Sequence, residues 1–226
     1  MTRTDETSTI QAVIFDLDGV LINSEEWWDE IRSGLAAEHG LPWPADATRR
    51  MQGMSTPEWA AYLSETVGIP GTADEVADVV ISRMAARYEA EVPLIPGAVE
   101  AVNDIADHWP IAIASSSPTR LINVVLEASG LADRVRVAMS TEDVEAGKPS
   151  PAVYLAVAGQ LGCDPAHTVG VEDSSNGLRS ASAADLIVVA VPNESYPPAP
   201  NALALADIVV TRLSELTPAV VRSLAP

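Results

Sequence analysis

Two acidic residues follow directly after a short apolar run near the start of the chain. Asp16 and Asp18 are separated by Leu17 and followed by Gly19, which allows the backbone to turn sharply. While the chain is still extended, side chains two residues apart point the same way, so both carboxylates can face one small volume. One carboxylate could attack a phosphorus atom, and the other could protonate the leaving oxygen. An Asx turn that ends a strand explains the pair equally well.

A run of small hydroxyl residues follows a second apolar run. Ser115, Ser116 and Ser117 precede Pro118. Hydroxyl and backbone donors at such a junction, together with the N-terminus of a helix, would attract a phosphate group. Ordinary helix capping, with Ser117 as the N-cap and Pro118 in the first helical position, explains the same residues. Both interpretations stay open at this point.

A lysine and a second acidic pair complete this set of polar residues. Lys148 precedes Pro149, which disfavours helix at the lysine, and its ammonium group could neutralise a phosphoryl group and the attacking carboxylate. Glu172 and Asp173 follow another apolar run, where they could hold Mg²⁺ together with Asp16, directly or through water. The plain alternatives are a solvated loop lysine and acids that favour the start of a helix.

Taken together, these residues supply a nucleophile, phosphate donors, a cation and metal ligands. Each lies near the end of a predicted strand or the start of a predicted helix. Phosphoryl transfer depends above all on in-line positioning and on neutralisation of charge. The combination therefore indicates a magnesium-dependent phosphate-transferring enzyme whose nucleophile is Asp16.

Six short apolar runs predict the buried strands that position these residues. They are Gln11–Phe15, Ile111–Ala114, Val135–Ala138, Thr168–Val171, Leu186–Val191 and Ile208–Val210. Helices are predicted to begin at Pro96 or Gly97, at Pro118, at Ser150-Pro151 and at Ser174 or Ser175. Strands that alternate with helices predict an α/β fold with a doubly wound parallel sheet and a Rossmann-like core. In such sheets the site lies outside the carboxyl ends of the strands.

One long segment departs from this alternation of strands and helices, because its pattern is helical throughout. The pattern is interrupted at residues 40–44, 53–55 and 68–71. We expect residues 23–92 to form a helical cap inserted after the first strand, and residues 1–22 and 93–226 to form the catalytic core. The segment leaves from the strand that carries the acidic pair, which favours a lid over the site. A separate helical domain with a structural role would give the same pattern.

Four of the five tryptophans lie in this segment: Trp27, Trp28, Trp43 and Trp59. They could form a wall that stacks on the substrate. Aromatic residues in a small helical subdomain more often pack its interior, and this alternative stays open.

Composition limits the partners and the location. The 226 residues carry a formal net charge of -19, which argues against nucleic acid and anionic membranes as partners. The polar start and the lack of a long apolar run predict a cytoplasmic protein. The single Cys163 excludes an internal disulfide, and the three histidines are scattered, so oxygen ligands and Mg²⁺ are favoured over a transition metal. A monomer is favoured over a stable oligomer.

In order and spacing, four segments resemble the motifs of the haloacid dehalogenase superfamily, in particular its phosphatases and phosphomutases with a small helical cap. These segments are Phe15–Leu21, Ala114–Ser117, Gly147–Pro149 and Gly170–Ser174. The resemblance covers nearly the whole chain. It implies that Asp16 is the nucleophile and a metal ligand. It also implies that Asp18 is the acid/base, and that its backbone carbonyl contacts magnesium.

The same resemblance gives roles to the other polar residues. It implies that Ser115 and Ser116 bind the transferring phosphoryl group with help from Lys148. Asp173 would complete the metal site, and Glu172 would bind the metal directly or lie next to a ligand. Dehalogenases of the superfamily lack the second aspartate of the first motif, so Asp18 argues against that chemistry.

The cap region keeps part of the family pattern. Glu25 matches a common Asp-Ser-Glu run, although Asn23 replaces its aspartate. Gly53, Met54 and Ser55 resemble a loop that reaches into the site and screens substrates. Together with Glu25, these three residues are the candidates for substrate contacts in the cap.

Two absences in the cap bear on the reaction. Sugar phosphomutases of the superfamily tend to place an arginine where this chain has Thr56, and they use a cap lysine that has no counterpart here. The absences favour hydrolysis of a small phosphorylated metabolite, such as a sugar phosphate. A phosphomutase of the β-phosphoglucomutase kind stays open, because Arg49 or Arg50 could substitute. A non-catalytic sensor of phosphorylated ligands is a third hypothesis, but a sensor has no need of Asp18.

Overall fold

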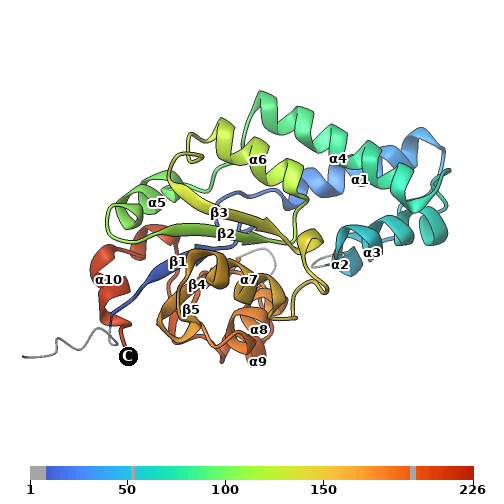
Figure 1. Ribbon diagram of the computed structural model, residues 1–226. Helices are drawn as coiled ribbons and strands as arrows, with labels where there is room; N and C mark the ends of the chain where they lie inside the picture. The colour runs from blue at the N-terminus through green and yellow to red at the C-terminus, as the bar shows by residue number, and fades with distance from the viewer. Residues whose placement is uncertain (1–8, 52–53, 194–196) are drawn as a thin grey trace, which may run out of the picture.

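Six parallel strands form one sheet in the computed structural model, which describes residues 9–51, 54–193 and 197–226 (Figure 1). Side by side, they are β3 (Val135–Ser140), β2 (Ile111–Ser115), β1 (Ala12–Phe15), β4 (Thr168–Glu172), β5 (Ile187–Ala190) and β6 (Ile208–Val209). Every neighbouring pair is parallel. The chain therefore winds outward from β1 in both directions. The predicted doubly wound sheet is confirmed, and all six predicted strands are present.

Helices cover both faces of the sheet (Figure 1). One face carries α5 (Ala98–Ala106), α6 (Thr119–Ala128) and α10 (Pro218–Ser223). The other carries α7 (Ala152–Leu161), α8 (Ser175–Ala183) and α9 (Pro200–Leu203). Because side chains alternate along a strand, Val13 and Phe15 of β1 pack into one apolar cluster and Ile14 packs into the other. A strand covered on both faces is apolar throughout, as β1 is.

The predicted helices α5 to α8 lie where proline and serine signals place them. The helix signals described above do not predict α9 and α10. Pro200 and Pro218 each occupy the first turn of a helix. Proline fits that position because the first helical N–H groups have no partner within the helix.

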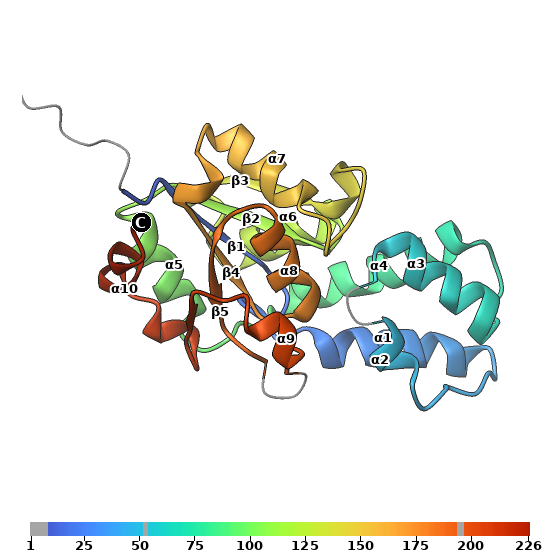
Figure 2. The ribbon, with the colours of Figure 1, turned by 90° about the horizontal axis from the view of Figure 1, so that it is seen from below.

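The segment between β1 and α5 is helical and lies next to the carboxyl ends of the strands (Figures 1 and 2). It contains α1 (Glu25–Glu38), α2 (Ala47–Met51), α3 (Thr56–Ala61), a π-helical turn at Tyr62–Val67, and α4 (Ala73–Ala90). We call this segment, residues 25–90, the helical insert. Helix α4 packs along α6, which joins the insert to the core.

The two connections between the insert and the core run side by side. Ile22 and Leu94 form an antiparallel bridge. On either side of it, Asn23 N donates to Pro93 O at 2.8 Å and Ile95 N donates to Leu21 O at 2.9 Å. The chain therefore enters and leaves the insert at one place.

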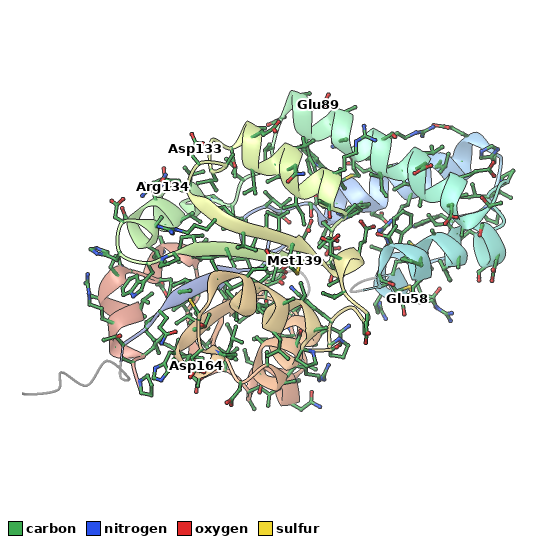
Figure 3. All side chains as sticks on the ribbon, viewed as in Figure 1. Glu58, Glu89, Asp133, Arg134, Met139 and Asp164 are labelled. Carbon is green, nitrogen blue, oxygen red and sulfur yellow. The ribbon has the colours of Figure 1, made fainter. Side chains whose placement is uncertain are left out.

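Acidic side chains account for much of the surface. Glu58 on the insert, Glu89 on α4, and Asp133 and Asp164 on loops of the core are all exposed and lie on well-separated parts of the molecule (Figure 3). These four acids therefore do not form one cluster.

The buried strand β2 supplies a stability test. Ile113 is fully buried, so Ile113→Ala should lower the free energy of unfolding by about 2–5 kcal/mol through lost apolar contacts and a cavity. Urea denaturation measures this. Leu155 on α7 is 45% exposed, and Leu155→Ala should stay within about 0.5 kcal/mol of the wild type. Equal losses for the two variants would contradict the assigned core.

Candidate active site

The carboxyl ends of three neighbouring strands bring the predicted residues together. Asp16 follows β1, Ser115 ends β2, and Glu172 ends β4 with Asp173 next in the chain. Asp16 N donates to Val171 O at 2.9 Å, which continues the pairing of β1 with β4 up to the nucleophile candidate. The carboxyl ends of parallel strands share one edge, as the predicted position of the site requires.

Three buried carboxylates form a candidate metal centre. Asp16, Glu172 and Asp173 each offer an oxygen, and these oxygens lie within 4.8 Å of one another. Asp173 Oδ1 is buried and has no hydrogen-bond partner among the residues that the structure describes. Buried carboxylates of like charge repel unless a cation compensates them, and an orphaned carboxylate oxygen is costly. The donor set therefore fits a divalent cation that prefers oxygen ligands.

Lys148 lies against two of these acids. Its Nζ donates to Asp16 Oδ1 at 2.9 Å, to Glu172 Oε1 at 2.6 Å and to Ala114 O at 2.9 Å. Burial lowers the pKa of the ammonium group, but attraction by Asp16 and Glu172 outweighs burial and raises that pKa above its usual range. Lys148 is therefore charged, and its three N–H donors are all used within the protein.

The pKa values of two carboxyl groups in the cluster are also raised. Burial raises the pKa of Asp16, Glu172 adds to the rise, and Lys148 opposes it. Burial also raises the pKa of Asp173 well above its usual range, and the charges of Asp16 and Glu172 add to it. One lysine thus leaves the cluster short of positive charge, which a bound divalent cation would supply.

Three hydroxyl groups hold Asp18 beside this cluster. Ser24 Oγ donates to Oδ1 of Asp18, while Ser117 Oγ and Ser115 Oγ donate to Oδ2 at 2.6 and 3.4 Å. The interpretation of Ser117 as a helix cap is wrong. Pro118 is the N-cap of α6, and the Ser117 hydroxyl binds Asp18 instead. The local sequence does not distinguish helix capping from a role in the site, because small hydroxyl residues are typical of both.

Two glycines make room for the acids. Gly19 has φ of +82°, and a Cβ there would lie 2.0 Å from Asp173 Oδ2. A Cβ on Gly177 would lie 1.8 Å from Glu172 Oε2. The expected sharp turn at Gly19 is confirmed, and the positions of both acids require glycine at these two places.

Tyr154 fixes Glu172 from the other side. Its hydroxyl donates to Glu172 Oε1 at 2.6 Å, and Lys148 Nζ lies 5.2 Å from the centre of its ring. The sequence patterns do not single this residue out. Tyr154 occupies a fully buried position of α7, where an aromatic residue is indistinguishable from ordinary core.

A cavity of about 120 Å³ opens over these residues, and core and insert both line it. The core contributes Asp16, Asp18, Ser115, Ser116, Ser117, Pro118, Lys148, Asp173, Ser174 and Asn176. The insert contributes Glu25, Trp28, Arg32, Met51, Met54 and Trp59. The predicted phosphate-binding serines, the lysine and the acids at positions 16, 18 and 173 therefore share one cavity with the insert.

Of the four substrate candidates in the insert, Glu25 and Met54 line the cavity. Gly53 lies outside the described residues. Ser55 lies outside the cavity lining: its side chain and backbone N donate to Glu58 as the N-cap of α3. The spacing of Ser55 and Glu58 is a capping signal that the sequence already contains.

The tryptophans of the insert divide between two roles. Trp28 and Trp59 are buried and line the cavity, so they pack the insert and face the site together. Trp27 and Trp43 pack against the apolar core of the protein. The packing interpretation therefore holds for all four tryptophans, and the stacking of Trp28 and Trp59 on a substrate stays a prediction.

The arginines proposed as substitutes for a phosphomutase cation lie elsewhere. Arg49 and Arg50 are exposed and outside the cavity lining, and Arg50 pairs with Asp46 at 2.7 Å. Arg32 lines the cavity instead, and sequence analysis missed it. The available signal was spacing, since Glu25, Trp28 and Arg32 recur at intervals of three and four residues on one face of α1.

Comparisons with known proteins decide the family. The model of the haloacid dehalogenase-like hydrolases matches residues 10–185. The chain belongs to this family. The predicted superfamily and the predicted hydrolase class are thereby confirmed.

Similar proteins cover nearly all of the chain. Hexitol phosphatase B of Escherichia coli K12 is 34% identical over 218 residues, which are 92% of this chain and 95% of that protein. A phosphorylated carbohydrates phosphatase of Thermotoga maritima is 29% identical over 78% of this chain and 82% of its own. The crystal structure of a putative β-phosphoglucomutase from T. maritima is similar with a TM-score of 0.72 and 28% identity, over 91% of this chain and 96% of that one.

No helix in the described part of the chain is long and apolar enough to cross a membrane.

The glycine beside Glu172 supplies a test of the candidate metal centre. Gly177→Ala should displace the Glu172 carboxylate and weaken Mg²⁺ binding by about 10- to 100-fold, as changes to supporting groups of metal sites do. Isothermal titration with MgCl₂ measures this. Gly159→Ala on α7 is the matched control, because nothing lies within 4 Å of the added Cβ. Unchanged Mg²⁺ affinity in Gly177→Ala would contradict a metal role for Glu172.

Proposed function

We propose that this protein is a magnesium-dependent phosphatase that hydrolyses a small phosphorylated metabolite, such as a sugar or sugar-alcohol phosphate, through an aspartyl phosphate on Asp16. The observation that carries the proposal is the placement of Asp16 in the cavity. Its carboxylate belongs to the buried acidic cluster, accepts a hydrogen bond from Lys148, and lies beside Asp18. The similar hexitol and carbohydrate phosphatases support the substrate class.

The reaction has two steps. An oxygen of Asp16 attacks phosphorus, and the bond to the leaving oxygen breaks while Asp18 gives that oxygen a proton. Asp18 then takes a proton from water as the water attacks the aspartyl phosphate, which releases inorganic phosphate and restores Asp16. Mg²⁺ held by Asp16, Asp173 and Glu172 would neutralise charge on the phosphoryl group.

The other core residues bind the group being transferred. Ser115 and Ser116 line the cavity next to the carboxylates and are proposed to donate hydrogen bonds to the phosphoryl oxygens, for which the Ser115 hydroxyl would give up its long 3.4 Å bond to Asp18. Lys148 opposes the rise in the pKa of Asp16 and so favours the ionised form that a nucleophile requires, and it contributes positive charge near the phosphoryl group. The three hydroxyl groups around Asp18 hold its carboxylate in place between the two steps.

The helical insert is proposed to be a cap, with residues 23–92 as the cap and residues 1–22 and 93–226 as the catalytic core. Two observations support this division. The insert supplies one side of the cavity, and its two connections to the core lie together at Ile22 and Leu94. Segments that join at one place are suited to act as a hinge.

A panel of phosphorylated metabolites tests the function. With MgCl₂ present, the wild type should release inorganic phosphate from sugar or sugar-alcohol phosphates, and Asp16→Asn should release none above background. Interconversion of hexose phosphates, primed by a bisphosphate, would indicate a phosphomutase instead. Absence of any turnover, with ligand binding retained in Asp16→Asn, would indicate a sensor.

Asp18→Asn separates acid/base chemistry from metal binding. Because the proposed contact of Asp18 with magnesium is a backbone carbonyl, kcat should fall by about 10²- to 10⁴-fold while Mg²⁺ binding stays close to wild type. Steady-state kinetics over a range of MgCl₂ concentrations measures both effects. Asp46→Asn, at an exposed position paired with Arg50, is the control. Equal loss of turnover and of Mg²⁺ affinity would contradict the role of the Asp18 side chain.

A further inference from the structure

Arg32 is a buried cation on the insert side of the cavity. It is 9% exposed, lines the cavity, and its Nε has no hydrogen-bond partner within the described residues. A buried N–H without a partner costs free energy, so a guanidinium in this state calls for an acceptor. Arg32 lines the cavity, so an acceptor on a ligand could approach the guanidinium group from there.

Two tryptophan rings hold the guanidinium in place. Its Cζ lies 4.5 Å from the ring centre of Trp28 and 4.7 Å from that of Trp59. The two rings are tilted at 57° to each other, so Arg32 sits in an aromatic corner instead of between parallel faces. Cation–π contacts of this kind fix a planar group but accept no hydrogen bond in its plane, which leaves the edge of the guanidinium for a ligand.

Arg32 is charged at neutral pH. Burial lowers its pKa to about 10, and the nearby charges of Glu25, Asp18 and Asp29 oppose that fall. Other arginines of the insert serve surface ion pairs: Arg83 pairs with Glu38 and Arg87 with Glu30. Arg32 differs from them in being buried and in facing the cavity.

A ligand with an anionic group at each end requires a cation on the insert side of the cavity as well as near Asp16. Lys148 is committed to Asp16, Glu172 and a backbone carbonyl, and the carboxylates of Asp18 and Glu25 also line the space. Arg32 and Lys148 are the cations among the described residues that line the cavity, so an anion of the ligand beyond the phosphoryl group would be attracted chiefly by Arg32.

We propose that Arg32 binds a second oxyanion of the substrate, a carboxylate or a phosphate, at the end remote from the phosphoryl group that Asp16 attacks. The inference rests on the proposed phosphatase function and narrows its substrate class. Guanidinium groups bind such oxyanions through two parallel hydrogen bonds. Among phosphorylated metabolites, the preferred substrate is then a phosphorylated sugar acid or a sugar bisphosphate, ahead of the phosphate of a neutral sugar or polyol.

Pairs of substrates that differ only in the remote group test the inference. Sorbitol 6-phosphate and gluconate 6-phosphate share a six-carbon chain and differ by a carboxylate, and fructose 6-phosphate and fructose 1,6-bisphosphate differ by a phosphate. In the wild type, kcat/KM should be about tenfold or more higher for the member with the second anionic group in at least one pair. Hydrogen bonds between charged groups are strong enough for a preference of this size. The pair that shows the preference identifies which oxyanion Arg32 binds.

Variants of Arg32 should remove the preference. Arg32→Gln should bring the kcat/KM ratio of that pair close to one, mainly through KM, and Arg32→Lys should give an intermediate ratio because charge stays but the planar fork is lost. Arg87→Gln is the matched control. Arg87 also lies over a tryptophan, with its Cζ 4.1 Å from the ring centre of Trp27, but outside the cavity, so the ratio should match the wild type.

Folding controls and direct binding measurements keep the inference testable if a variant folds poorly. Near-ultraviolet circular dichroism and thermal unfolding establish that each variant keeps its tertiary structure, and Arg32→Lys replaces Arg32→Gln if the latter does not fold. Tryptophan fluorescence, for which Trp28 and Trp59 are built-in reporters, then measures the affinity for both members of each pair without turnover. The member with the second anionic group should bind more tightly than its counterpart to the wild type, and this difference should be absent in Arg32→Gln.

The outcomes separate this inference from the proposed function. If esters are hydrolysed without preference for either anionic member, or if Arg32→Gln lowers kcat/KM equally for both members, the second oxyanion site is refuted and the phosphatase stands. If no ester is hydrolysed, the phosphatase fails, and the fluorescence titrations alone decide the site. Equal affinities of the wild type for both members of each pair would refute the second oxyanion site.

Discussion

Three carboxylates lie buried within a few ångströms of one another at the edge of the sheet, and their repulsion is the constraint that shapes the site. Lys148 reduces it by binding Asp16 and Glu172 at once, which ties the end of β1 to the end of β4. Tyr154 accounts for a further hydrogen bond to Glu172. Asp173 keeps an oxygen without a partner in the described structure, so the protein compensates only part of the charge. This arrangement favours a bound divalent cation over an empty site.

Under the proposed function, chemistry and selectivity would come from different parts of the chain. The groups that would break and form bonds are on the rigid edge of the sheet, where buried strands fix their positions. The groups that would contact the rest of a substrate are on the insert, whose aromatic and charged residues form the opposite side of the cavity. Residues of the insert can therefore change which substrate is accepted without moving the reacting carboxylates. Members of one family with similar cores can differ in substrate for this reason.

Most of the fold and the core of the site could be predicted from the sequence. The strands are apolar along their whole length because both faces are covered, and the acids follow them directly, so local patterns contain this information. Ser117 could not be assigned locally, because its partner Asp18 is 99 residues away in the chain. Arg32 acquires its environment from Trp59, which belongs to another helix. Ser55 is the converse case, since its bond to Glu58 is local and readable from spacing alone.

The paired connections at Ile22 and Leu94 have a consequence for how such proteins diversify. Besides the packing of α4 on α6, the insert is joined to the core through two adjacent connections. A longer, shorter or unrelated module could occupy this place without a change in strand order, because insertions are tolerated where chain ends lie close together. The junction is thus a natural grafting point, at which caps from other proteins could be exchanged onto one catalytic core.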